Sequence, residues 1–133
     1  MAELWLAIDT ATDVASVAVG DARRVAAARS LRGARQQSAQ IIPLIRQVLA
    51  EAEIGIGGIS GLVVGDGPGS FTGLRIGWAA AKGLAHERAL PLRAVPSLLG
   101  AAHAAAGGQI GPVAACYDAL RGQVFGAVYA FPP

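Results

Sequence analysis

The stretch GDGPGSFTGLRIGWAAAKGLA, residues 65–85, decides the fold because it connects a buried strand to a long helix through a glycine-rich turn. The run that leads into it, ISGLVVG at 59–65, is short and almost entirely apolar, as in a strand of a parallel sheet. The glycines of residues 65–73 permit a tight turn, and a helix is expected from about Ser70 or Thr72 to His86. Strand, turn and helix in this order predict a unit of an α/β protein.

The segments on either side extend this unit into an α/β domain with a mixed sheet. Hydrophobic periodicity predicts three successive strands before it, over residues 4–8, 14–19 and 23–30, and then a helix over 36–53. After it come a strand over 91–95, a helix over 97–106 that Ser97 is expected to cap, and two strands over 113–117 and 123–131. The predicted order is βββαβαβα followed by a hairpin, which contains two βαβ crossovers.

The helix over 36–53 carries an apolar stripe. Its members recur at steps of three and four residues and are Ile41, Ile45, Val48, Leu49 and Ala52. Ile42 and Leu44 broaden the stripe beyond what packing on one sheet requires. The helix begins either after Ser38 as an N-cap or at Gln36, and in the second case Pro43 lies inside it.

The helix that follows the glycine loop has a face of small residues. Small residues at four-residue spacing let a sheet or another helix approach closely. The residues of this face are Gly73, Gly77, Ala80, Ala81 and Leu84. Packing on its own sheet and packing on a partner helix are both compatible with this face. Together the two helices carry more apolar surface than one lobe needs, and such an excess is typical of a docking site.

The composition describes an ordered domain rich in alanine and glycine. For 133 residues one core is expected, and 53% hydrophobic against 15% charged residues excludes a disordered chain. No apolar run approaches the roughly 18–20 residues of a membrane span, and the first residues do not form a secretory signal, so a cytoplasmic protein is expected. The single cysteine, Cys116, lies in a predicted strand and is expected to be a small buried side chain.

Arginines are concentrated early in the chain. Five of them lie close together, namely Arg23, Arg24, Arg29, Arg32 and Arg35. They could contact the phosphates of a nucleic acid. They could equally form a solvated edge, because the net charge is only +2 and no aromatic side chains alternate with them for stacking on bases.

Polar groups at the ends of strands suggest two kinds of chemistry. The backbone amides of the glycine loop, residues 65–73, could bind a phosphate or carboxylate, or the loop could be a turn without a ligand. If the strands that Asp9 and Asp66 follow pair in parallel, the two carboxylates could share a divalent ion. The alternative is that Asp9 anchors the turn of Thr10–Thr12 by a hydrogen bond. A two-metal nuclease would need a third carboxylate, and the first helix offers only Glu51 and Glu53 at its far end. Zinc-binding histidine spacing and a serine nucleophile motif are both absent from the sequence.

Four segments of the chain resemble the TsaB (YeaZ) family in the same order along the sequence. They are LAIDTATDVASVAV at 6–19, IIPLIRQVLAEA at 41–52, GDGPGSFTGLRIGWAAAKGLA at 65–85 and YDALRGQVFGAVY at 117–129. The GPGSFTGLRIG run within the third segment is long and specific. The resemblance therefore extends over nearly the whole chain.

The resemblance implies the actin/Hsp70/sugar-kinase (ASKHA) fold. Residues 1–110 would form its N-terminal, ribonuclease-H-like lobe, and residues 111–133 would begin a second lobe that is expected to be truncated. Half of any nucleotide pocket would then be missing. The positions that match the phosphate loops of this superfamily would lie on an open surface, and they are Asp9, Thr10, Thr12, Gly67, Gly69 and Ser70.

The resemblance also implies a role in the synthesis of N6-threonylcarbamoyladenosine in tRNA. A TsaB-like chain is a non-catalytic scaffold that binds and activates a TsaD-like transferase, or pairs with itself, through the two longer helices. A TsaE-like ATPase joins the larger complex, and tRNA is reached through that complex. The interface residues expected on this basis are Ile41, Ile45, Val48, Leu49, Ile76, Ala80 and Leu84.

Metal chemistry is expected to belong to the partner. TsaD-like chains hold a metal with a histidine pair on the first helix, whereas residues 35–40 of this chain contain no histidine. We therefore expect no catalytic residue, metal or cofactor in this chain. ATP is expected to bind only in the assembled complex. The alternative is an ATP-dependent phosphotransferase or nucleotide-binding fragment of the same superfamily.

Overall fold

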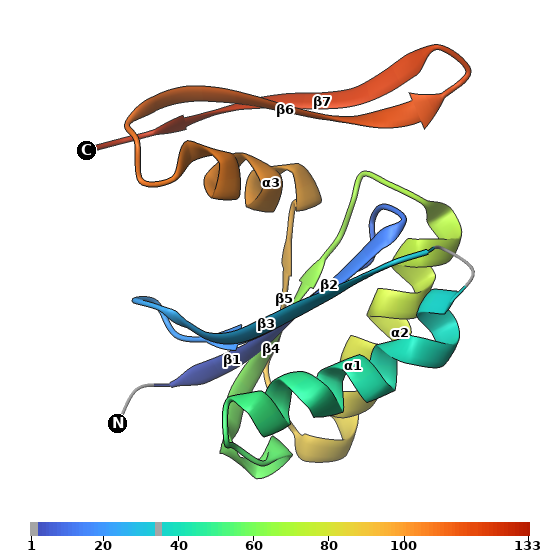
Figure 1. Ribbon diagram of the computed structural model, residues 1–133, viewed down its shortest axis with the longest axis vertical. Coiled ribbons are helices and arrows are strands. Elements are labelled where there is room, and N and C mark those ends of the chain that lie inside the picture. Colours follow the sequence, from blue (N-terminus) through green and yellow to red (C-terminus); the bar gives the residue numbers. More distant parts are fainter. Residues whose placement is uncertain (1–2, 34–35) are drawn as a thin grey trace.

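A five-stranded mixed sheet forms the centre of the computed structural model, which describes residues 3–33 and 36–133 (Figure 1). Its strands are β1 (Leu4–Asp9), β2 (Val14–Gly20), β3 (Val25–Arg32), β4 (Ile59–Gly65) and β5 (Leu92–Val95). They lie in the order β3-β2-β1-β4-β5. The first three strands are antiparallel, and β1, β4 and β5 are parallel, so the predicted mixed sheet is confirmed.

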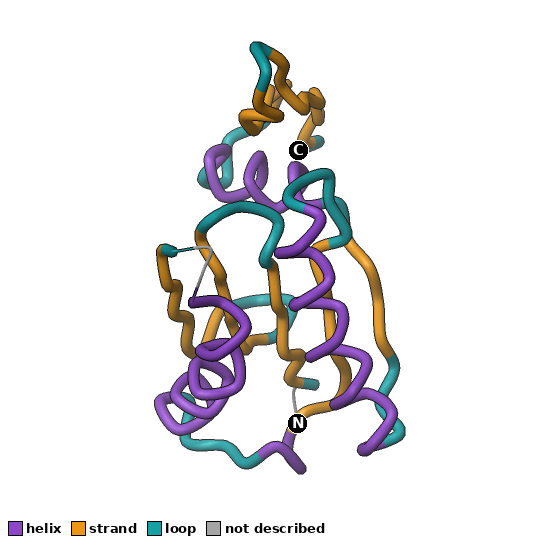
Figure 2. The backbone as a smooth tube through the Cα atoms, turned by 90° about the vertical axis from the view of Figure 1, so that its right-hand side faces the viewer, coloured by secondary structure: helices purple, strands orange, loops and turns teal. Residues whose placement is uncertain are grey.

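Two helices cover one face of the sheet, α1 (Gln37–Glu51) and α2 (Phe71–Arg88) (Figures 1 and 2). A short 3-10 helix, η2 (Ile56–Gly58), leads from α1 into β4. Helix α3 (Ser97–Ala106) lies on the other side, and a hairpin of β6 (Gly111–Leu120) and β7 (Gln123–Phe131) packs on it as a separate sheet. The element order is the predicted one. No helix within the described residues is long and apolar enough to cross a membrane.

The core lies between the sheet and the two covering helices. Strand register sets Leu6 beside Val19 and Leu62, so these side chains share one face of the sheet. All three are fully buried. They meet the apolar stripe of α1, whose buried members are Ile41, Leu44, Ile45, Val48 and Leu49. Burial of this stripe determines where α1 lies on the sheet.

Local hydrogen bonds move two element boundaries away from the predicted ones. Strand β3 begins at Val25 because the carboxylate of Asp21 accepts hydrogen bonds from the amides of Arg23 and Arg24, which holds these residues in a turn. Helix α1 begins at Gln37 after Gln36, which makes no side-chain cap, and Ser38 lies inside the helix. The prediction that places Pro43 inside α1 is thus the correct one.

Two side chains differ from their predicted roles. Ser97 is the first residue of α3 and does not cap it, because its hydroxyl instead accepts a hydrogen bond from the amide of Gly67 at 3.1 Å. Cys116 is exposed rather than buried. Every second side chain of β6 faces α3, and those between them face solvent. Cys116 is one of the solvent-facing side chains.

The hairpin is attached to α3 through alternating side chains. The hydroxyl of Tyr117 donates a hydrogen bond to the carbonyl of Ser97 at 3.1 Å, and the rings of His103 and Phe131 meet edge to face at 5.9 Å. The opposite face of the hairpin exposes Val124 and Val128 to solvent. One face of the hairpin is therefore packed and the other is not.

We expect Tyr117 to make stability fall in alkaline solution. Burial raises the pKa of this phenol above its ordinary value of about 10, and the negative charge of Asp9 raises it further. Because the folded pKa exceeds the unfolded one, the stabilisation is complete below about pH 10 and is lost as the pH rises through the folded pKa. Urea unfolding of the wild type and Tyr117→Phe across this range should show the loss in the wild type alone. An equal loss in the wild type and in Tyr117→Phe would contradict this assignment. The control is Tyr129→Phe, which keeps Tyr117 and should lose stability as the wild type does.

Candidate functional site

The glycine loop, residues 65–73, packs directly against the loop between β1 and β2. A Cβ atom at Gly69 would lie 2.2 Å from the carbonyl oxygen of Ala11, and one at Gly73 would lie 2.2 Å from that of Thr10. At Gly77 a Cβ atom would lie 2.4 Å from the hydroxyl of Thr10. Glycine is therefore required at 69 and 73 because two backbone segments touch there.

Hydrogen bonds join the same two loops. The amide of Ser70 donates to the carbonyl of Ala11 at 2.7 Å, and the hydroxyl of Thr10 donates to the carbonyl of Gly73. From α1, the side-chain amide of Gln37 donates to the carbonyl of Thr12 at 2.9 Å, and Gln37 is 1% exposed. Thr10 and Gln37 are thus buried polar groups with partners, which stabilise the junction of β1, α1 and α2.

The amides that a bound phosphate would use are already engaged in part. Those of Gly67 and Gly73 donate to the hydroxyls of Ser97 and Ser70, both at 3.1 Å. The carboxylate of Asp9 accepts a hydrogen bond from the amide of Ala11 at 2.8 Å. These bonds favour the interpretation of the loop as a turn that holds the fold together. Nucleotide binding at the six predicted positions stays a prediction.

The carboxylates at the sheet edge do not gather into a metal-binding set in the part of the chain that the structure describes. Asp9 lies beside Gly65, where a Cβ atom would be 2.2 Å from its carboxylate oxygen. It borders a groove of about 200 Å³ between the far face of the sheet and the start of α3. Asp66 is exposed. The other side chains that line this groove are mostly small or apolar and cannot act as metal ligands.

A larger groove of about 580 Å³ lies between α1 and α2. Its lining is mainly apolar and comes from α1, from the segment around η2 and from the end of α2: Ile42, Ile45, Leu49, Ile54, Ile56 and Leu84. Arg46, Glu87 and Arg88 also line it. An apolar floor with charged neighbours is the usual composition of a protein-binding surface.

The structure divides the predicted interface residues into two groups. Those on α1 belong to the core, because Ile41, Ile45, Val48 and Leu49 are all less than one tenth exposed. Those on α2, Ile76, Ala80 and Leu84, are half-buried and pack against the edge of the core. Only Ile45, Leu49 and Leu84 reach the groove. The α1 side chains therefore already have apolar partners within the chain, and Val48 offers no surface to a second protein.

Three isoleucines that line the groove were not among the predicted interface positions. Ile42 is 41% exposed, and its position beside the apolar stripe is the signal that could have identified it. Ile54 and Ile56 come from the short segment after α1, where no periodicity exists. Their place in the groove depends on how that segment folds back.

The arginine cluster is divided by the fold. Arg29 forms a hydrogen bond and ion pair with Glu51 of α1, which raises the pKa of the arginine, and Arg32 lies 3.4 Å from the carboxylate of Asp13. Arg23 and Arg24 are exposed at the turn before β3. Arg35 lies outside the described residues. Carboxylates thus neutralise two of these arginines.

Comparison with known proteins agrees with this architecture. A family model described as "TsaD: tRNA N6-adenosine threonylcarbamoyltransferase" matches residues 32–131. The "tRNA threonylcarbamoyladenosine biosynthesis protein TsaB" of Escherichia coli is 38% identical over 93% of this chain and 54% of its own length. The protein of the same name from Bacillus subtilis is 34% identical over 95% of this chain and 55% of its own.

A solved structure shows the same fold. "YeaZ from Pseudomonas aeruginosa" superposes with a TM-score of 0.89 and 31% identity, over 98% of this chain and 61% of that one. This chain is an α/β protein with a mixed sheet and a glycine loop. It therefore belongs to the group of proteins that the TsaD family model describes. Within that group it is a member of the TsaB (YeaZ) family. The chain spans about half the length of the curated relatives it matches.

Proposed function

We propose that this chain is a non-catalytic subunit in the synthesis of N6-threonylcarbamoyladenosine in tRNA, and that it binds and activates a TsaD-like transferase. The names of the relatives supply the pathway. The observation that carries the binding role is the apolar groove of about 580 Å³ between α1 and α2. Its lining is mainly apolar, and Ile42, which belongs to that lining, remains 41% exposed, as in a surface that a second protein covers.

The absence of catalysis in this chain is part of the proposal. Supporting it, the amides of the glycine loop are engaged within the chain, and the described residues hold no group of three metal-ligating side chains. In this proposal the chain needs no cofactor of its own, and ATP enters only with the assembled complex. A TsaE-like ATPase would join that complex, tRNA would be reached through it, and the work would take place in the cytoplasm.

The proposal includes a wider architecture. Residues 1–110 would be the ribonuclease-H-like lobe of an ASKHA fold, and residues 111–133 would be the start of its second lobe. The separate two-stranded sheet of β6 and β7, with an exposed apolar face, supports this division. An apolar sheet face that is open to solvent is expected where another layer of a lobe packs on it.

Binding to a TsaD-like transferase is the direct test. We expect Ile42→Asp to weaken this binding by about 100-fold, because a carboxylate would have to be desolvated in an apolar groove. Isothermal titration calorimetry of the two purified proteins measures the change. Ile110→Asp is the matched control, since Ile110 is 67% exposed and does not line the groove. Equal affinity of the wild type and Ile42→Asp would refute the groove as the interface.

Self-association would use the same surface. Both a homodimer and a complex with the transferase cover α1 and α2 in this proposal, so the two should compete. Analytical ultracentrifugation should then show a dimer of the wild type that Ile42→Asp dissociates and Ile110→Asp does not. A dimer unaffected by Ile42→Asp would place self-association elsewhere on the chain.

A further inference from the structure

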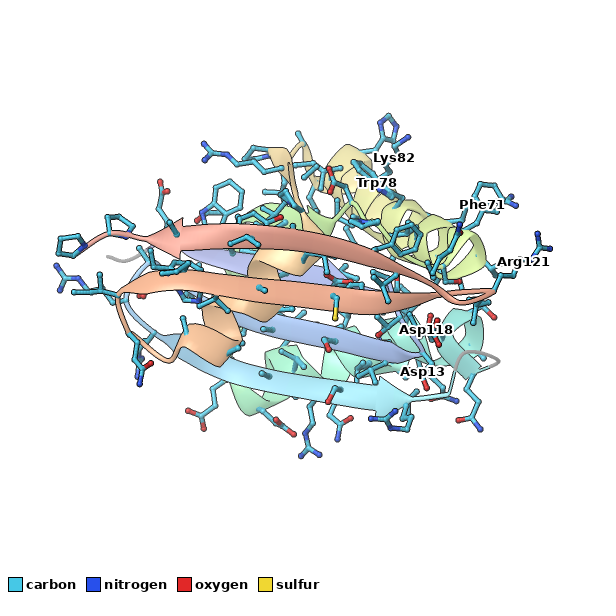
Figure 3. The ribbon with its side chains drawn as sticks, turned by 90° about the horizontal axis from the view of Figure 1, so that it is seen from above. Asp13, Phe71, Trp78, Lys82, Asp118 and Arg121 are labelled. Carbon is cyan, nitrogen blue, oxygen red and sulfur yellow. The ribbon has the colours of Figure 1, made fainter. Side chains whose placement is uncertain are left out.

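Strand β3 lies at one edge of the five-stranded sheet and pairs with β2 alone. In Figure 3 it is the pale blue strand along the lower side of the molecule, and no strand of the described chain lies beyond it. It has eight residues, whereas β5 at the other edge has four. β3 is therefore the longer of the two edges that a further strand could join.

The register of β3 shows which of its backbone groups point away from the sheet. The amide of Gly33 donates to the carbonyl of Asp13 at 2.8 Å, one position beyond the last pair of the ladder with β2. Hydrogen-bonded and non-hydrogen-bonded pairs alternate along an antiparallel ladder, so every second residue directs its amide and carbonyl outward. Counting back from Gly33, the outward residues are Ala28, Ser30 and Arg32.

The side chains of β3 leave this edge accessible. Native edge strands are often protected by proline, by lysine or by a bulge. β3 contains neither proline nor lysine, and its register shift lies at its start, between Val25 and Ala27. The side chains of Ala28 and Ser30 are small and exposed. A second strand could therefore approach along residues 27–32 and bond to the outward groups.

The segment that contains β3 is positively charged. Residues 22–50 include six arginines and no acidic residue. Arg23 and Arg24, which precede the strand, form no ion pair with the described residues. At the other end, the side chain of Arg32 remains 77% exposed despite its contact with Asp13. Positive charge thus lies at both ends of the open edge, about 26 Å apart because each residue of a strand advances about 3.3 Å.

A second copy of this chain fits the edge poorly. Antiparallel pairing of two β3 strands joins the outward groups of both, so two registers pair most of the strand. The register centred on Ala28 sets Arg32 beside Arg24 of the other copy. The register centred on Arg29 sets the two Arg29 side chains opposite each other. Like charges directly opposite one another destabilise a pair of strands.

Nucleic acid also fits the edge less well than a peptide does. The outward carbonyl oxygens of β3 alternate with its outward amides, and these oxygens would repel phosphates. β3 carries no aromatic side chain on which a base could stack. A peptide strand, by contrast, offers an amide to each carbonyl and a carbonyl to each amide.

We propose that the edge of β3 binds an extended, acidic segment of another protein by β-strand addition. The backbone of that segment pairs with the outward groups of Ala28, Ser30 and Arg32, and its carboxylates contact the arginines at the two ends of the edge. This surface is separate from the groove between α1 and α2, because no residue of β3 lines that groove. The inference therefore does not rest on the proposed function.

Fluorescence anisotropy with a labelled nonapeptide in which glutamate and valine alternate tests the charge on the edge. We expect saturable binding to the full chain at about 0.1 M salt, which Arg24→Gln/Arg32→Gln should weaken about tenfold. Arg75→Gln/Lys82→Gln removes the same charge from exposed positions of α2 and should change the affinity less than about twofold. A lack of saturable binding, or an equal loss in the two double variants, would overturn the proposal.

A backbone variant tests the strand addition itself. Ser30→Pro removes one outward amide and leaves the bonds to β2 in place, so it should weaken peptide binding about tenfold. Ser30→Ala keeps the amide and should bind as the wild type does, and circular dichroism checks that both variants fold. In amide hydrogen exchange of the wild type, the peptide should slow the exchange of Ala28, Ser30 and Arg32. This readout decides the question even where Ser30→Pro does not fold.

Three results would overturn strand addition at this edge. They are wild-type affinity in a folded Ser30→Pro protein, exchange slowed only outside β3, and tighter binding of an oligouridylate than of the acidic peptide. The last of these would make the edge a nucleic-acid contact. Transferase binding, measured by calorimetry, should be the same in Ser30→Ala, Arg24→Gln/Arg32→Gln and the wild type. The two proposals can therefore fail separately.

Discussion

Replacing Gly73 with alanine is expected to lower the free energy of unfolding by about 3 kcal/mol, which corresponds to a fall of about 10 °C in Tm. The new Cβ atom would lie 2.2 Å from the carbonyl oxygen of Thr10, far inside van der Waals contact. The obstacle is backbone, so it cannot move aside by a change of rotamer. The two loops would have to separate, and that separation would break the bond from the Thr10 hydroxyl to Gly73.

The same helix offers a matched control. Gly83 is exposed, and a Cβ atom there would have no neighbour within 4 Å. Gly83→Ala should therefore raise the free energy of unfolding by about 0.5–1 kcal/mol through helix propensity alone. Urea denaturation of both variants measures the difference. A stability of Gly73→Ala equal to that of the wild type would show that the loops are not in contact as described.

Replacing Val48 with aspartate is expected to prevent folding at 25 °C. Val48 is fully buried between α1 and the sheet, and the described residues around it in the core are hydrophobic. The substitution removes apolar burial and places a carboxylate without a partner in the core, with a combined cost of about 5 kcal/mol or more. That is comparable with the entire stability of a typical domain, about 5–15 kcal/mol. Circular dichroism and amide proton spectra should report an unfolded chain.

Ile42→Asp on the same helix is the comparison for that experiment. Ile42 is 41% exposed, so its aspartate remains in water and the fold should survive with a change of about 1 kcal/mol or less. The pair separates a residue that maintains the fold from one that is available to a partner. A folded Val48→Asp protein that lost only transferase binding would restore Val48 as an interface residue.

Much of the fold could be predicted because its signals are local. The apolar run at 59–65, the period of α1 and the glycine turn before α2 each depend on residues within a few positions of one another. The order of all the strands and helices followed from them, and the specific run at 67–77 indicated the family. Boundaries were less accurate, because single side chains such as Asp21 determine them.

The candidate site could be predicted only in part, because it depends on contacts between distant residues. The hydrophobic pattern of α1 identified apolar positions, but not that Val48 is buried in the core while Ile42 lines the groove between α1 and α2. The groove needs α1, the η2 segment and the end of α2 together. Only their packing brings them to one place.

The sequence alone was sufficient for the elements, their order and the family, since short-range periodicity and a specific motif carry that information. The role of each glycine in the loop was decided by the tertiary structure. Gly73 meets Thr10, which is 63 residues away, and this contact shows that the glycines allow two backbones to touch. The tertiary structure also decided which amides of the loop are engaged, which arginines contact a carboxylate and which isoleucine of α1 remains exposed. Each depends on the distance between groups that are far apart in the sequence and meet only in the folded protein.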